Sequence, residues 1–275
     1  MQKVLDQLKS KTSLRILHVT DVHFALENVR RLKERLQTEK IDLILLSGDN
    51  ADMTMDPKAP PDIVEKHEND MRQVVEGLES IHPTVIYIPG NHDAVTTFRD
   101  DPPQMTPQSI SLHKRSVQLT PSLRLIGFGG SVPGVQNGEK VFEGFPYQTE
   151  EEFAEEFLPA IEQFQLSDFL GSTILMTHIG PASLGTAVDR SDILNPVEMG
   201  STTLRKTMES AALQKTVFLH IHGHSHGAPG SIKVGRTTIV NPGPLRYGCF
   251  ALYTVAQQLP DSVWKLSELT IGRVE

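Results

Sequence analysis

Residues 85–93 read VIYIPGNHD, an apolar run of strand character that ends in an amide, an imidazole and a carboxylate at Asn91, His92 and Asp93. Four other apolar runs end in the same kinds of side chain. They are RILHVT at 15–20 before Asp21 and His23, DLILLSG at 42–48 before Asp49, TILMT at 173–177 before His178, and TVFLHIHG at 216–223 before His224 and His226. Ligand-binding side chains in α/β folds gather beyond the carboxyl ends of strands. We therefore expect these residues to converge on one metal site.

The spacing of apolar residues around these runs predicts an α/β fold. Helical periodicity over 27–37 and about 63–78 separates the first three strands, which predicts parallel β-α-β units with right-handed crossovers. Two more helices are expected, over about 149–164 and 201–213. Later strands are expected at 123–128, 173–176, 217–220, 237–240 and 250–255. Because the late strands are closely spaced and suggest hairpins, we expect two mixed sheets packed together with helices outside.

Size and composition are typical of a globular protein. The chain has 275 residues, a formal net charge of −8 and one cysteine, Cys249. We expect a single domain over 1–275, with residues 1–13 as an N-terminal extension. No apolar run approaches the roughly 18 residues of a membrane span, and the first residues lack the apolar core of a secretory signal. Since a lone cysteine cannot form an internal disulfide, we expect a reducing, cytoplasmic location.

The residue types at the strand ends suit divalent cations. Asp21 and His23 stand two positions apart and could hold one ion together. Gly48 permits an unusual backbone angle that would turn the carboxylate of Asp49 into the site. The two oxygens of that carboxylate could then bridge two cations.

The ordered set of motifs resembles the calcineurin-like metallophosphoesterase superfamily. The matching motifs are Asp-x-His at 21–23, Gly-Asp at 48–49, Gly-Asn-His-Asp at 90–93, His178, and Gly-His-x-His at 223–226, and the resemblance extends from residue 16 to about 244. It implies a four-layer α-β-β-α sandwich with a dinuclear metal centre. By this resemblance one ion is bound by Asp21, His23, Asp49 and His226, and the other by Asp49, Asn91, His178 and His224.

The resemblance also implies a reaction. Two divalent ions can acidify a bridging water, so that a metal-activated hydroxide attacks the phosphorus of a phosphoester. His92 is expected to contact the phosphate and protonate the leaving oxygen, and Asp93 to orient His92. Two carboxylates would leave about two positive charges on two divalent ions, which suits an anionic substrate. Histidine-rich ligation favours manganese, with iron, zinc, cobalt and nickel as alternatives.

A small phosphodiester or phosphomonoester is the expected substrate, and three alternatives stay open. A phosphoprotein phosphatase of this superfamily has Asp-Arg-Gly after Gly-Asp and Glu after Gly-Asn-His, whereas this chain has Asn50 and Asp93 there. A nuclease is disfavoured by the acidic balance and the lack of a Lys/Arg run, so nucleic acid is not an expected partner. A non-catalytic binding scaffold would be expected to have lost ligands. The sequence does not encode the oligomeric state.

Other segments carry weaker signals. The insert at 131–148 contains three glycines and three aromatic residues, and we expect an ordered, irregular loop that could overhang the site. His18 lies inside a predicted strand and is expected in the core. The remaining histidines outside the pattern are expected at the surface: His67, His82 and His113.

Overall fold

One of two large mixed sheets contains the first strands of the chain. The computed structural model describes residues 5–52, 56, 58–165, 169–258 and 262–275. The strand order of this sheet is β16 (Val263–Arg273), β15 (Cys249–Gln258), β1 (Ser13–Val19), β2 (Leu43–Leu46), β3 (Val85–Tyr87) and β4 (Ile110–Ser111). β1 to β4 are parallel, which the β-α-β pattern predicted for the first three of them. β15 joins this block antiparallel, through β1, and pairs with β16 on its other side.

The second large sheet is built around a parallel core of its own. Its strand order is β13 (Gly230–Val234), β14 (Thr237–Asn241), β12 (Val217–Ile221), β9 (Ser172–Thr177), β6 (Leu123–Phe128) and β5 (Arg115–Thr120). The four inner strands are parallel, and the two outer strands pair antiparallel. Both sheets are therefore mixed, as expected.

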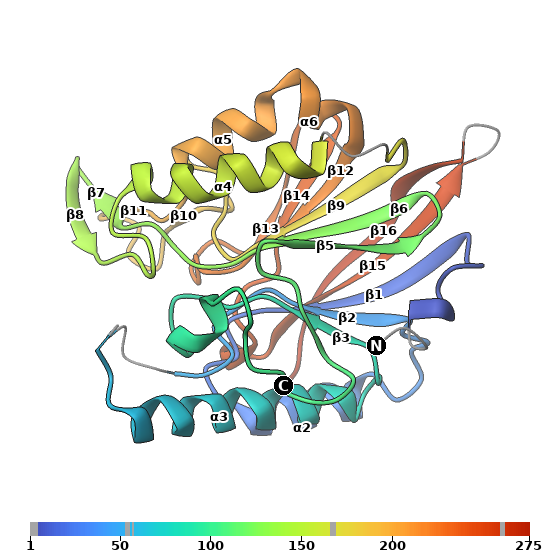
Figure 1. Cartoon of the computed structure of the whole chain (residues 1–275), viewed down its shortest axis with the longest axis horizontal. Helices are drawn as coiled ribbons and strands as arrows, with labels where there is room; N and C mark the ends of the chain where they lie inside the picture. Colours follow the sequence, from blue (N-terminus) through green and yellow to red (C-terminus); the bar gives the residue numbers. More distant parts are fainter. Residues whose placement is uncertain (1–4, 53–55, 57, 166–168, 259–261) are drawn as a thin grey trace.

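Helices cover the outer face of each sheet. The helices α2 (Leu26–Arg35) and α3 (Pro61–Glu79) lie on the first sheet, whereas α4 (Glu150–Gln165), α5 (Thr202–Glu209) and α6 (Ala211–Thr216) lie on the second (Figure 1). Between the sheets, residues such as Ile16 and Leu45 pack against Leu125 and Met176 in one apolar cluster. The predicted four-layer α-β-β-α sandwich is confirmed.

One predicted helix is two helices in the structure. The helix expected over 201–213 breaks at Ser210, whose extended backbone ends α5 and whose side chain accepts a hydrogen bond from the N–H of Leu213 in α6. Serine favours a cap position because its hydroxyl competes for backbone hydrogen bonds. The single-helix prediction was therefore wrong at this residue.

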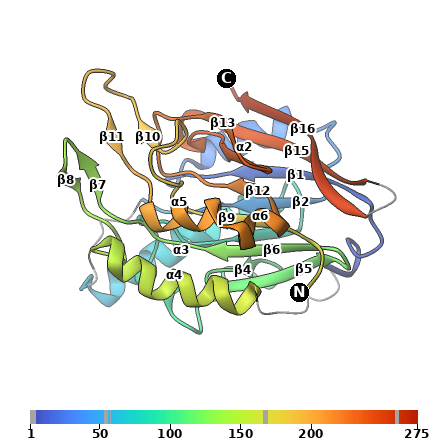
Figure 2. The same ribbon diagram turned by 90° about the horizontal axis from the view of Figure 1, so that it is seen from above.

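A third, small sheet lies beyond one end of the large sheets (Figure 2). Its strand order is β10 (Val188–Asp189), β11 (Val197–Glu198), β7 (Gly134–Gln136) and β8 (Glu139–Phe142). The insert at 131–148 is thus not wholly irregular, because it contains the β7–β8 hairpin. Phe145 and Tyr147 are buried and fix the insert to the body, whereas Phe142 is exposed.

The amino-terminal segment contributes to the core. Leu5 and Leu8 are buried in the cluster between the sheets. Residues 1–4, and residues 53–55 and 57 between β2 and α3 in the sequence, lie outside the described residues. Among the residues that are described, no helix is long and apolar enough to cross a membrane.

Candidate metal centre

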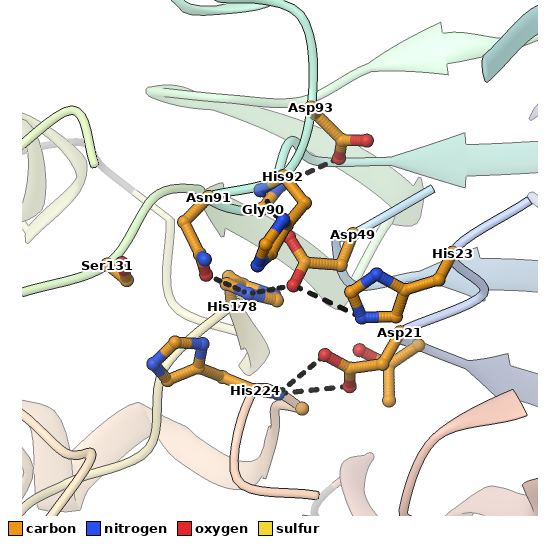
Figure 3. Close-up of polar contacts among 12 residues, drawn as sticks. Asp21, His23, Asp49, Gly90, Asn91, His92, Asp93, Ser131, His178 and His224 are labelled. Atoms are coloured by element: carbon orange, nitrogen blue, oxygen red, sulfur yellow. Dashed lines mark hydrogen bonds and ion pairs between the residues drawn. The ribbon is translucent and has the colours of Figure 1, made fainter. Parts of the chain in front are cut away.

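All seven predicted ligands follow the carboxyl ends of parallel strands, and they come from both large sheets. The first sheet positions four of them, after β1 (Asp21 and His23), β2 (Asp49) and β3 (Asn91). The second sheet positions the other three, after β9 (His178) and β12 (His224 and His226). Figure 3 shows side chains from the two sheets pointing toward one another across the interface. The structure therefore brings together the residues that the strand-end pattern singled out.

The ligand atoms fall into two groups that share Asp49. Within each group the candidate ligand atoms lie within 4.8 Å of one another. The first group is Asp21, His23, Asp49 and His226, and the second is Asp49, His178 and His224. The side-chain oxygen of Asn91 lies 3.0 Å from Nε2 of His178, which places it beside the second group. Their role as metal ligands remains a proposal, taken up below.

Contacts inside the first group suit a bound cation. The Nε2 atoms of His23 and His226 face each other at 3.3 Å, and Nε2 of His226 lies 3.2 Å from a carboxylate oxygen of Asp21. A cation between these atoms would satisfy several lone pairs at once.

The second group contains a buried ring nitrogen that lacks a hydrogen-bond partner in the described part of the chain. Nε2 of His224 is buried and has no hydrogen-bond partner among the described residues. Buried polar atoms are rarely left unsatisfied, and such an exception calls for an explanation such as an ion. The donor set therefore fits divalent metal in both groups.

Neighbouring groups fix the ring orientation of two histidines. Nδ1 of His178 lies 2.8 Å from the carbonyl oxygen of Ser47, which can only accept, so Nδ1 carries a proton and Nε2 is the ring nitrogen that faces the site. Nδ1 of His23 lies 2.9 Å from a carboxylate oxygen of Asp52, with the same result. The motif pattern did not single out Asp52, although it stands three residues after Asp49. Its carboxylate also lies 3.6 Å from the guanidinium of Arg246.

Four of the predicted ligands have backbones in the left-handed region. Their φ angles are +50° for Asp21, +46° for His23, +52° for Asp49 and +64° for His224. This conformation is uncommon for residues other than glycine and concentrates at functional sites. Backbone hydrogen bonds hold it here, from the N–H of Asp21 to the carbonyl of Gly48 (3.0 Å) and from the N–H of His23 to the carbonyl of Asp49 (2.9 Å).

Gly48 allows the two sheets to approach at the centre. Its φ is +103°, which confirms the unusual angle expected from the Gly-Asp motif. A Cβ atom at this position would fall against Nδ1 of His178 and the backbone of Gly90. Glycine is therefore required here both for the backbone angle and for space.

Burial, and the attraction between carboxylates and imidazoles, set the protonation states of the side chains in the centre. Burial raises the pKa of Asp49, but the attraction of His178 outweighs it and holds the pKa well below the usual range. Burial lowers the pKa of His178, yet Asp49 more than compensates and raises it to about 9. Burial lowers the pKa of His224 to about 3. Asp49 is thus ionised and His224 neutral near pH 7, the states in which each can bind a metal.

His92 and Asp93 lie next to the two groups. The backbone N–H of His92 donates to Oδ1 of Asp49 (2.7 Å), and the rings of His92 and His23 are 5.1 Å apart. The carboxylate of Asp93 accepts four hydrogen bonds, each 2.8 Å long. The donors are the backbone N–H groups of Gly90, Asn50 and Ala51 and the side-chain amide of Asn50. Asp93 therefore ties the loop after β3 to the loop after β2. Its expected part in orienting His92 stays a prediction.

A cavity of about 400 Å³ opens over this centre. Five of its lining residues belong to the predicted site: Asp49, Asn91, His92, His224 and His226. The candidate ligands are thus accessible to a small molecule from one side, while Asp21 and His178 lie almost wholly buried behind them.

Histidines outside the centre differ from expectation in two cases. His18 is buried as predicted, with its ring nitrogens bonded to Tyr253 and Ser47. His113 was expected at the surface but is buried, and its Nδ1 accepts from the N–H of Gly129 (2.9 Å). His67 was also expected there, yet it lies on the buried face of α3 that includes Met71, so the surface predictions for both were wrong.

Comparison with known proteins places this geometry in a family. The profile of the calcineurin-like phosphoesterases matches residues 14–228. An uncharacterised protein of Methanocaldococcus jannaschii is 25% identical over 178 residues, which make up 64% of this chain and 72% of that protein. The crystal structure of TT1561 of Thermus thermophilus has 19% identity and a TM-score of 0.59, and it covers 96% of this chain and 100% of that one.

A dimetal phosphatase of Danio rerio has 10% identity and a TM-score of 0.54, and covers 95% of this chain and 99% of that one. At such identities the two structures show a shared fold. The family profile covers most of the chain and all seven candidate ligands, and it ends before β13. The chain belongs to the calcineurin-like phosphoesterase family.

Proposed function

We propose that this protein is a dinuclear metal-dependent phosphoester hydrolase that acts on a small phosphodiester or phosphomonoester. The observation that carries the proposal is the position of Asp49 between two groups of ligand atoms. Asn91 completes the second group, so that each ion would have four protein ligands. When bound, two divalent ions would neutralise phosphoryl oxygens and acidify a water nucleophile.

The chain's own side chains would then bind and protonate the substrate. His92 lines the cavity beside Asp49 and Asn91, where its ring could reach a phosphoryl group held at the centre. We assign to His92 a contact with the phosphate and the transfer of a ring N–H proton to the leaving oxygen. Asp93, which fixes the loop that carries His92, acts as a positioning residue.

Manganese is the metal that we propose first. Five of the ligands offer imidazole nitrogen or amide oxygen and two offer carboxylate, a mixture that suits manganese, iron, zinc, cobalt or nickel better than calcium or magnesium. The single cysteine supports a reducing compartment, and we place the enzyme in the cytoplasm.

A metal-resolved activity assay tests this function. The protein is stripped with a chelator, reloaded separately with manganese, iron, zinc, cobalt or nickel, and assayed with bis-p-nitrophenyl phosphate and p-nitrophenyl phosphate. We expect no hydrolysis without metal and clear turnover of at least one ester with manganese. If fully loaded protein, with two ions per chain, hydrolysed neither these nor a wider set of esters, a non-catalytic scaffold would be the better account.

A further inference from the structure

The small sheet forms the outer wall of the cavity over the metal centre. The cavity is lined on this side by Phe142 at the end of β8 and by Val197 and Met199 at and after β11. These strands lie beyond the ends of the large sheets, where the candidate ligands are found (Figure 1). Any group attached to a phosphate at the centre would therefore meet the small sheet.

The small sheet and its β10–β11 loop expose several apolar side chains on and around this wall. Among the described residues, eleven large apolar side chains are exposed, and five of them belong to the small sheet and its β10–β11 loop. The five are Val135, Val141, Phe142, Ile193 and Leu194, of which Phe142 lines the cavity. Apolar side chains that are clustered and exposed beside a cavity mark a binding surface more often than scattered ones do.

The charged residues of the same cavity are all acidic. Glu143, Asp189 and Asp192 line it, and none of the described lining residues is lysine or arginine. The backbone N–H groups of Ser191 and Gly227 hold the carboxylate of Asp189 in place, at 2.8 and 2.9 Å. The metal centre thus attracts one anionic group, whereas the wall beyond it repels a second one.

We infer that the cavity selects phosphoesters whose alcohol portion is apolar and uncharged. This inference rests on the function proposed above and names its substrate class. The phosphoryl group would lie at the metal centre, with the alcohol portion packed on Phe142, Val197 and Met199. Esters that carry a further phosphate or carboxylate, such as nucleoside diphosphates, are rejected by Asp189 and Asp192, whereas Glu143 is already paired with Lys140 at 2.8 Å.

Binding of stable phosphonates tests the inference without turnover. Methylphosphonate, hexylphosphonate and 6-phosphonohexanoate are titrated by calorimetry into manganese-loaded and metal-free protein. We expect all binding to need metal, and hexylphosphonate to bind at least about tenfold more tightly than methylphosphonate, because several methylenes leave water. We expect 6-phosphonohexanoate to bind at least about tenfold more weakly than hexylphosphonate.

Two variants test separately the apolar packing on Phe142 and the repulsion of a second anion by Asp192. Phe142→Ala should weaken hexylphosphonate about fivefold and change methylphosphonate less than about twofold. Val141→Ala is the matched control, since this neighbouring side chain on β8 is exposed but does not line the cavity, and it should change neither. Asp192→Asn keeps an acceptor oxygen for the N–H of Leu194 and should strengthen only 6-phosphonohexanoate, by about threefold.

The outcomes distinguish this inference from the proposed function. Metal-dependent binding of methylphosphonate with no gain for hexylphosphonate would overturn the inference and leave the phosphoesterase proposal standing. Equal losses in Phe142→Ala and Val141→Ala would also overturn it. Failure of every phosphonate to bind metal-loaded protein would count against the proposed function itself.

Discussion

The two oxygens of Asp49 face different neighbours. Oδ1 accepts the backbone N–H of His92, whereas Oδ2 lies 3.4 Å from Nε2 of His178 and 3.7 Å from Nε2 of His23. The carboxylate therefore stands between imidazoles that come from opposite sheets. Its removal would take one ligand from each of the two groups.

Variants of Asp49 and His92 should separate metal binding from proton transfer. Asp49→Ala is expected to lose bound metal and activity together, whereas His92→Ala should keep both ions and lose about 10²- to 10⁴-fold in kcat. Metal content by elemental analysis and steady-state kinetics measure the two effects. His82→Ala serves as a control, because this partly buried histidine lies outside the centre. Two ions per chain in Asp49→Ala would refute the bridging position.

Gly48→Ala and Gly138→Ala should differ although both glycines have positive φ. A Cβ at Gly138 meets no atom within 4 Å, whereas a Cβ at Gly48 meets His178. We expect Gly138→Ala to lower the free energy of unfolding by about 1–2 kcal/mol, from backbone strain alone. Gly48→Ala should lower it by about 2–5 kcal/mol and weaken metal binding, since overpacking is added. Urea denaturation measures both, and equal losses would show that the space around Gly48 is unimportant.

At this scale the sequence singled out the seven candidate ligands but not the groups that orient them. The seven ligands stood out because each follows an apolar run, and runs are visible in sequence. Asp52 did not stand out, because its contact with His23 depends on the path of the loop after β2, which no periodicity determines. His67 could have been placed correctly, since it stands four residues before Met71 on one helical face.

Among the elements, the strands that carry ligands were the most predictable. β2, β9 and β12 are buried along their whole length, and β1 is buried from Ile16 onward, so these strands appear in sequence as largely apolar runs. β7, β8, β10 and β11 have two to four residues each and lie within loops, so pattern reasoning missed them. β16 was also missed, because exposed polar residues interrupt its apolar ones along an edge strand. The missed strands include those that wall the cavity, so the sequence could not indicate substrate class.

The cap of α5 joins two elements of the outer helical layer. Oγ of Ser201 accepts the N–H of Leu204 and donates to the carboxylate of Glu150 at the start of α4. Ser201→Ala should therefore lower the free energy of unfolding by about 1–3 kcal/mol, because the buried N–H of Leu204 and the partly buried carboxylate of Glu150 both lose a partner. Thr202→Ala, at the exposed neighbouring position, should change it by less than about 0.5 kcal/mol. Chemical denaturation compares the two, and similar losses would show that the cap contributes little.

At the scale of the whole molecule, the packing of one sheet on the other assembles the centre. Each sheet alone carries only part of either ligand group, and the apolar cluster between the sheets sets their relative position. Pattern reasoning predicted two packed sheets, but not the alignment that brings His226 to Asp21. That alignment depends on side-chain packing across the whole interface, which the order of motifs along the chain does not specify.

Metal should stabilise the whole fold. Metal that binds only the folded chain shifts the folding equilibrium toward it. Manganese at 100 times its Kd should add about 2.7 kcal/mol, a rise in Tm of about 5–10 °C. Thermal unfolding of chelated and reloaded protein measures this. Asp49→Ala should show little of the rise, and an equal rise in that variant would place the stabilising ions elsewhere.

Anomalous X-ray scattering from crystals soaked in manganese tests the central claim most directly. The account predicts two peaks about 3.5–4 Å apart, one among Asp21, His23 and His226, the other among Asn91, His178 and His224, with Asp49 in contact with both. A single peak, or two peaks that do not share Asp49, would contradict it.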